Sequence, residues 1–93
     1  MRFVFMIPGP LREFSGDRGE VRVDGTAASV SQALSLLWTH CPAVRDRIVT
    51  ELGEVRPHIN IFIDGDSIRD SGGLGAPVRD GAEIVILPAL SGG

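Results

Sequence analysis

The carboxyl end of this 93-residue chain is the stretch whose residue types could take part in chemistry. A strand-like apolar run ends at Pro88, which has no N–H to donate, so regular strand pairing should stop there. The chain then stops on Gly92 and Gly93, which have no Cβ and could enter a slot too narrow for a side chain. Extended, residues 88–93 would reach about 20 Å at ~3.3–3.6 Å each. A frayed terminus is the alternative interpretation, because chain ends are often disordered.

A terminal carboxylate is a poor electrophile until a partner enzyme activates it. ATP can convert it to an acyl-adenylate, and sulfide or a persulfide can then displace AMP to leave a thiocarboxylate. Nothing in the chain is suited to performing these steps. Its task would be to carry the thiocarboxylate and to be recognised by the enzymes that act on it. All nine basic residues are arginine, so an activated terminus would find no lysine to acylate in its own chain.

Side chains elsewhere do not form a catalytic or metal-binding pattern. His40 and His58 lack partners at metal-ligand spacing and are interpreted as structural or surface residues. Cys41, the only cysteine, excludes an internal disulfide and is expected to be a small packed residue. The aspartates between 64 and 70 lack the spacing of an EF-hand, and no lysine follows the glycines of 72–75. The sequence therefore predicts a protein that is not an enzyme and that binds no metal or cofactor.

Size and composition limit the remaining classes of function. Ninety-three residues make one domain, and 43% hydrophobic residues are enough for one modest core. The net charge of −3 argues against a nucleic-acid partner. No apolar run approaches the ~20 residues of a membrane helix, and residues 1–8 are too short for the apolar part of a signal peptide. We therefore expect a cytoplasmic protein that contacts no membrane.

Hydrophobic periodicity indicates a sheet and two helices. Ser29 and Gln32 have the spacing of a capping box, and the apolar residues that follow, Trp38 included, form one helical face aimed at a core. Pro42 could begin a second, shorter helix whose apolar stripe ends at Leu52. Alternation and turn residues predict strands at 2–7, 20–24, 58–63, 66–69 and 82–87, with a loop over 11–19 whose Leu11 and Phe14 tuck under the domain edge.

The strands near the C-terminus are apolar on both faces. Phe62 opposes the isoleucines of its strand, and Val85 and Leu87 oppose Ile84 and Ile86. One helix layer covers one face of a sheet, so the second apolar face is either covered by loops or left as a docking patch. We predict that Phe62, with Val85 and Leu87 and with some contribution from Val4 or Met6 of the first strand, docks partner proteins.

The order of these elements and the terminal Gly92-Gly93 resemble the ubiquitin-like β-grasp sulfur carriers, the MoaD/ThiS/CysO family. The similarity covers the whole chain, and its specific part is the C-terminal third. Residues 60–65, Ile68-Arg69, the 71–74 segment and the ending from Ile86 to Gly93 carry it. The 68–74 stretch and the Ile86-Leu87-Pro88-Ala89 ending look most like CysO, the carrier of cysteine biosynthesis. Molybdopterin synthase small subunits rank second and thiamin carriers third.

The resemblance implies an α+β, ubiquitin-like β-grasp fold. A mixed four- to five-stranded sheet would pack on one main helix and a second short helix, with the domain over 1–87 and a flexible tail over 88–93. It also implies an E1-like adenylyltransferase that uses ATP and a sulfur-accepting synthase. Gly93 would carry the adenylate and the thiocarboxylate, and Leu90, Ser91 and Gly92 would be recognised. A molybdopterin-synthase small subunit and a ubiquitin-like protein modifier remain as alternatives.

Overall fold

Alternating apolar and polar residues near the N-terminus form the predicted hairpin. In the computed structural model, which describes residues 1–88, β1 (Arg2–Met6) pairs antiparallel with β2 (Glu20–Asp24). Phe3 and Phe5 of β1 are 0% exposed, and the alternate residues of β2 are also buried. The hairpin therefore presents one face to the core and one to solvent.

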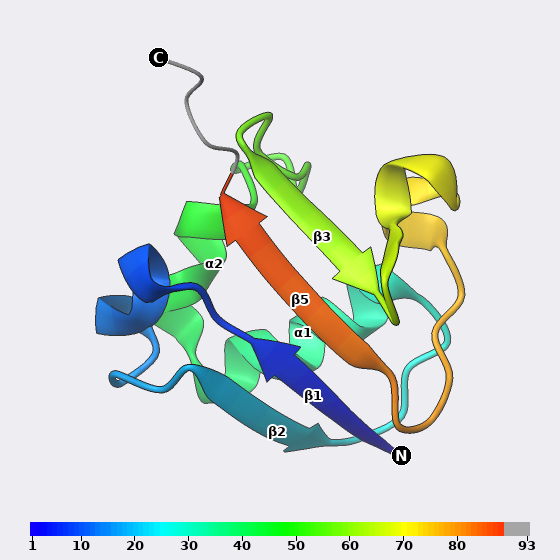
Figure 1. Cartoon of the computed structure of the whole chain (residues 1–93), viewed down its shortest axis with the longest axis horizontal. Coiled ribbons are helices and arrows are strands. Elements are labelled where there is room, and N and C mark those ends of the chain that lie inside the picture. Colours follow the sequence, from blue (N-terminus) through cyan, green and yellow to red (C-terminus); the bar gives the residue numbers. More distant parts are fainter. Residues whose placement is uncertain (89–93) are drawn as a thin grey trace.

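Three further strands complete a mixed sheet, as predicted. Its order is β2-β1-β5-β3-β4. The central strand β5 (Glu83–Pro88) runs parallel to β1 and antiparallel to β3 (Ile59–Ile63), and the short β4 (Asp66–Ser67) lies at the edge. Figure 1 shows this sheet from its open face, with the helices behind it. Parallel pairing of the first and last strands requires a crossover, which the helices provide.

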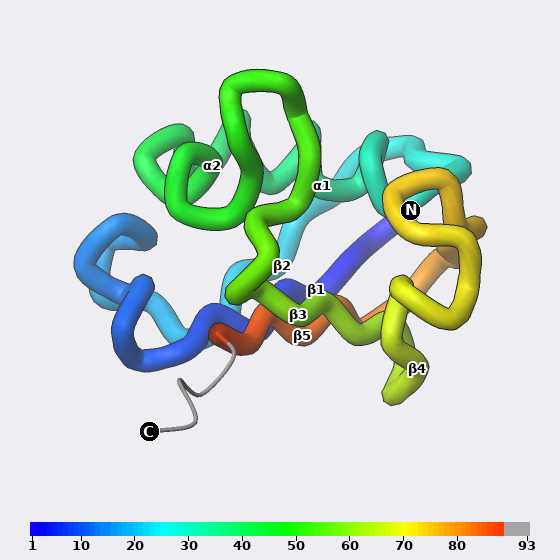
Figure 2. Tube along the Cα trace, turned by 90° about the horizontal axis from the view of Figure 1, so that it is seen from above, coloured from blue at the N-terminus to red at the C-terminus, as the bar shows by residue number. Residues whose placement is uncertain are grey.

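Both helices lie on the same face of the sheet (Figure 2). The capping box predicted for α1 (Val30–His40) is present: Ser29 Oγ accepts a hydrogen bond from the Gln32 N–H at 3.3 Å. The Gln32 side chain reaches back and accepts from the Ala28 N–H at 2.7 Å. Pro42 is the first residue of α2 (Pro42–Ile48), where its missing N–H costs nothing.

One hydrophobic core lies between the helices and the sheet. Each large apolar side chain buried there contributes about 1.5–3 kcal/mol relative to exposure. Leu11 is buried and Phe14 packs half-buried against this core, as predicted. The largest fully buried side chains are those of Phe3, Phe5, Leu37, Ile48, Ile59, Ile61, Ile84 and Ile86.

The second helix is shorter than the sequence predicts, and the placement of Leu52 was wrong. α2 stops at Ile48 because Val49 becomes extended and pairs with Val55 in an antiparallel bridge. Thr50 and Gly53 close the turn between them, where the Gly53 N–H donates to the Thr50 carbonyl at 2.9 Å. Leu52 lies at the apex of this turn and is 85% exposed instead of lying on the helical stripe.

Three smaller expectations also need correction. Trp38 is only half-buried and packs against the core from its edge, because Leu34 and Leu37 fill the part of α1 that faces the sheet. The predicted edge strand at 66–69 is interrupted after Ser67, whose hydroxyl accepts from the Arg69 N–H and begins a 3-10 turn. The loop after β1 contains a 3-10 helix at Gly9–Phe14.

Candidate functional site

The face of the sheet opposite the helices carries an apolar row across its three central strands. Met6 of β1 is paired with Val85 of β5, and Val85 is paired with Phe62 of β3. Each of the three is half-buried. Their neighbours along the strands, such as Ile61 and Ile84, are buried against the helices, so strand alternation directs this row away from the core.

The row continues along the strands in both directions. Val4 lies two residues before Met6, and Leu87, which is 44% exposed, lies two residues after Val85. We call Val4, Met6, Phe62, Val85 and Leu87 the open-face patch. Both helices of the described chain pack on the other side of the sheet (Figure 2). Apolar surface that remains accessible in one domain is typical of an interaction site, and the docking role of the patch remains a prediction.

Polar side chains border the open-face patch. Across the strands, Glu20 is opposite Met6, Arg22 and Glu83 flank Val4, and Asn60 is opposite Leu87 in β3. Glu20 and Arg22 form an exposed ion pair with Nε and Oε2 3.0 Å apart. An apolar centre with a polar rim is the usual anatomy of a protein–protein interface.

Pro88 occupies the last position of β5, one residue beyond the predicted end of the strand. It is opposite Ile59, whose own N–H donates to the Arg56 carbonyl at 2.9 Å. The Ile59 carbonyl accepts from the Arg69 guanidinium at 3.1 Å. The Ile59 backbone groups are therefore bonded on the side away from β5, so Pro88 stands at a non-hydrogen-bonded pair that requires no N–H.

Four of the predicted site residues lie outside the described part of the chain: Leu90, Ser91, Gly92 and Gly93. Their roles, and the division between residues 1–87 and 88–93, remain predictions. The structure brings the predicted docking residues together on one face of the sheet, and along β5 the patch runs from Val85 to Leu87, the residue before Pro88.

The other side chains considered for chemistry are dispersed. His40 and His58 are exposed and lie on different elements. Cys41 is 3% exposed, as expected for a packed residue, and the Arg18 guanidinium lies 3.3 Å from its sulfur. Within residues 1–88, metal-ligating side chains do not gather in groups of three or more. No helix in that range is both long enough and apolar enough to span a bilayer.

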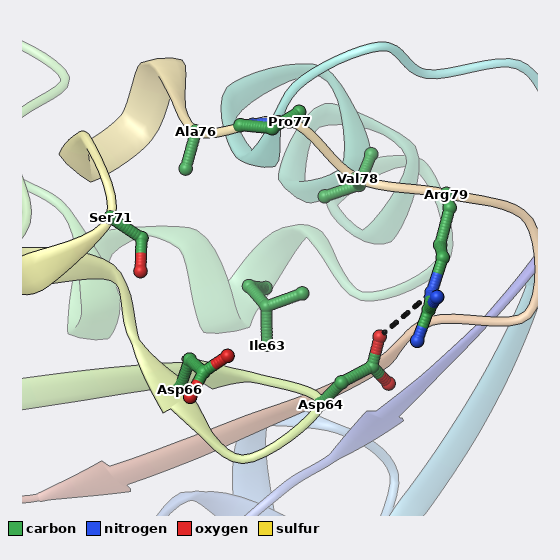
Figure 3. Close-up of a pocket in the computed structure, with 8 residues that line it drawn as sticks. All are labelled: Ile63, Asp64, Asp66, Ser71, Ala76, Pro77, Val78 and Arg79. Carbon is green, nitrogen blue, oxygen red and sulfur yellow. Dashed lines mark ion pairs between the residues drawn. The ribbon is translucent and has the colours of Figure 1, made fainter.

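Sequence reasoning missed one feature, a pocket at the end of the sheet where β5 begins. Ile63 forms its floor, Asp64 and Asp66 of the β3–β4 turn form one wall, and the segment 76–79 forms the other (Figure 3). Ser71 closes one end. These residues come from separate segments with no shared pattern, so the sequence carries no signal that would unite them.

A mixed sheet that packs one main helix, with first and last strands parallel at its centre, defines a ubiquitin-like β-grasp protein. A chain in the crystal structure of the Amycolatopsis orientalis BexX/CysO complex is similar, with a TM-score of 0.87 and 32% identity. That match covers 98% of this chain and 99% of the solved one.

The chain belongs to the ThiS family, whose family model matches residues 5–93. It is 28% identical to the sulfur carrier protein CysO of Mycobacterium tuberculosis, with both chains covered in full. It is 36% identical to small archaeal modifier protein 1 of Haloferax volcanii, over 89% of this chain and 91% of that protein. The protein is therefore a member of the group of sulfur carriers and ubiquitin-like small modifiers, small proteins on which partner enzymes act.

Proposed function

We propose that this protein is a sulfur carrier that works through the carboxylate of Gly93. An E1-like enzyme adenylates this carboxylate, sulfur replaces the adenylate, and the resulting thiocarboxylate donates sulfur to the biosynthesis of cysteine or of another sulfur-containing metabolite. The observation that carries the proposal is the match to the ThiS family, which extends through the terminal Gly-Gly. The similarity to CysO favours cysteine as the product.

The proposed steps balance without a cofactor in this chain. The Gly93 carboxylate attacks the α-phosphorus of ATP, and pyrophosphate leaves. Sulfide then attacks the acyl carbon, the bond between that carbon and the AMP oxygen breaks, and a thiocarboxylate remains. If a persulfide attacks instead, the product is an acyl disulfide, which a thiol must reduce.

The geometry of the described residues supports a carrier that docks on a partner enzyme, with the chemistry performed by that enzyme. The open-face patch offers an apolar surface to a partner, and β5 ends at Pro88 beside it. The five residues after Pro88 have a reach of about 17 Å at ~3.3–3.6 Å each. A partner docked on the patch could therefore receive the terminal carboxylate in its own active site. ATP would bind to that partner.

Intact-mass spectrometry of the protein isolated from its native host tests the proposal directly. A thiocarboxylate adds about 16 Da, because sulfur replaces one oxygen of the activated acyl group. The added mass should disappear after incubation with a sulfur acceptor and should map to the C-terminal peptide. If the protein carries only its unmodified mass, even after ATP and the cognate activating enzyme are supplied, the proposal is wrong.

Two other functions remain within this family. The similarity to small archaeal modifier protein 1 favours a protein modifier, which would join its C-terminus to lysines of target proteins. Higher-mass adducts in a lysate would identify that function. A small subunit of molybdopterin synthase would instead co-purify one-to-one with a larger synthase subunit.

A further inference from the structure

The pocket beside the β3–β4 turn has room for a long side chain. Its volume is about 400 Å³. Figure 3 shows Ile63 at the floor between two walls, with Ala76 and Val78 on one side and the Asp66 carboxylate on the other. Ile63 and Val78 are only half-buried, so apolar surface remains accessible inside the pocket.

Two polar side chains of this pocket, Ser71 and Asp66, can accept hydrogen bonds from a ligand. Ser71 Oγ donates its proton to the Ser67 carbonyl at 3.0 Å, so toward the pocket it can only accept. Among the hydrogen bonds and ion pairs of residues 1–88, none engages the carboxylate of Asp66. Arg79, which also lines the pocket, forms an ion pair with Asp64, with its Nε 3.5 Å from Oδ2. Asp66 and Ser71 thus offer two acceptors to a ligand that carries donors.

Both oxygens of the neighbouring Asp64 carboxylate already have a partner. Its Oδ1 accepts from the Glu83 N–H at 3.0 Å while its Oδ2 faces Arg79. Asp64 therefore holds the turn to the start of β5 and leaves Asp66 as the acidic group free to bind a ligand. An apolar floor with an unpaired carboxylate at the wall matches a side chain with an alkyl stem and a cationic head.

The charge of the surrounding surface has the same sign as Asp66. Strand directions bring to this end of the sheet the starts of β1 and β5 and the ends of β2 and β3. Two arginines, Arg2 and Arg79, lie there against five carboxylates. The amino group of Met1 offsets one of the three excess negative charges. The carboxylates are those of Asp24, Asp64, Asp66, Asp80 and Glu83.

We infer that this pocket binds an arginine side chain of a partner protein. The guanidinium donates to the Asp66 carboxylate and to Ser71 Oγ, and its methylene stem lies over Ile63 and Val78. Arginine fits better than lysine because its planar head offers five donors to two separate acceptors. The pocket lies at the opposite end of β5 from Pro88, about 17–20 Å away at ~3.3 Å per residue. One partner could hold this pocket and the tail together.

This inference names a contact of the proposed partners and in that respect rests on the proposed function, but the pocket can be tested without them. The probe is N-acetyl-L-arginine amide, titrated into ¹⁵N-labelled protein and followed by heteronuclear NMR. N-acetyl-L-citrulline amide, which has nearly the same shape without the charge, serves as the control at matched ionic strength. Saturable shifts should map to the amides of Ile63, Asp66, Ser71 and Val78 with arginine and not with citrulline.

Two variants show which carboxylate is responsible. Asp66→Asn keeps the size of the side chain and should weaken arginine binding about three- to tenfold, because a charge-assisted bond becomes a neutral one. Glu54→Gln removes an exposed carboxylate from the turn after α2 and should leave binding unchanged. Dispersed spectra confirm that both variants fold. Equal shifts with citrulline, unchanged binding in Asp66→Asn, or no saturable shift up to 100 mM probe would overturn the inference. A lack of thiocarboxylate would affect only the proposed function.

Discussion

Gly93 is the residue on which the proposed sulfur chemistry depends. Deleting it would leave the carboxylate about 3.5 Å short of the adenylating centre. Misplacement by even ~1 Å can cost about 100-fold in rate. We therefore expect ATP-dependent adenylation by the cognate activating enzyme to fall by at least that factor. Gly92→Val should also slow adenylation. Its β-branched side chain would not fit the narrow channel expected in the activating enzyme, and it would restrict the backbone.

Both changes lie outside the residues that form the described core, so thermal melting provides the control. Both variants should melt within about 1 °C of the parent, because substitutions away from packed features usually change stability by less than ~0.5 kcal/mol. Conversion of the Gly93-deleted protein at the parental rate would mean that the terminus is not the working group. The carrier hypothesis would then be wrong.

At the scale of elements, the open face of the sheet is the surface to test. Phe62 is the half-buried aromatic residue of the open-face patch and is paired with Val85 at its centre. Phe62→Asp places a charge where a partner would bury an aromatic ring. An aromatic anchor buried in an interface contributes about 2 kcal/mol or more, so affinity for the activating enzyme should fall by about 30-fold. Isothermal titration calorimetry measures the change.

A matched substitution on the other side of the molecule separates docking from general charge. Ser35 is exposed on α1, on the helix side of the sheet. Ser35→Asp adds the same charge and should leave the affinity unchanged. If both variants bind as well as the parent, the open-face patch is not the docking surface. If Phe62→Asp unfolds, Phe62→Ser offers a milder change at the same position.

At the scale of the whole molecule, one core supports every strand that positions the tail. Leu37 on α1 is 0% exposed, whereas Leu52 is 85% exposed. Leu37→Ala should lower the free energy of unfolding by about 2–5 kcal/mol, because a cavity adds to the lost transfer energy. Leu52→Ala should change it by less than ~0.5 kcal/mol. Urea denaturation measures both, and equal losses would contradict the observed end of α2.

The sequence by itself determined the features that arise from local patterns. Alternation over residues 2–6 and 20–24 was enough for the hairpin, and the Ser29–Gln32 spacing located the start of α1. Alternation also predicted that Phe62 and Val85 point away from the core. The element order, the Gly-Gly ending and the 68–74 segment were enough for the family, because each can be read from the sequence alone.

Only the tertiary structure decided which distant residues meet. The parallel pairing of β1 with β5 places Met6 beside Val85, and no local pattern specifies that register. Leu52 fits a helical stripe by spacing, yet the Val49–Val55 bridge ends the helix before it. The Asp66 pocket joins β3, the 3-10 turns and the 76–79 segment. Local periodicity fixes the face on which a side chain lies, whereas its neighbours depend on long-range pairing and on burial that compete with local preference.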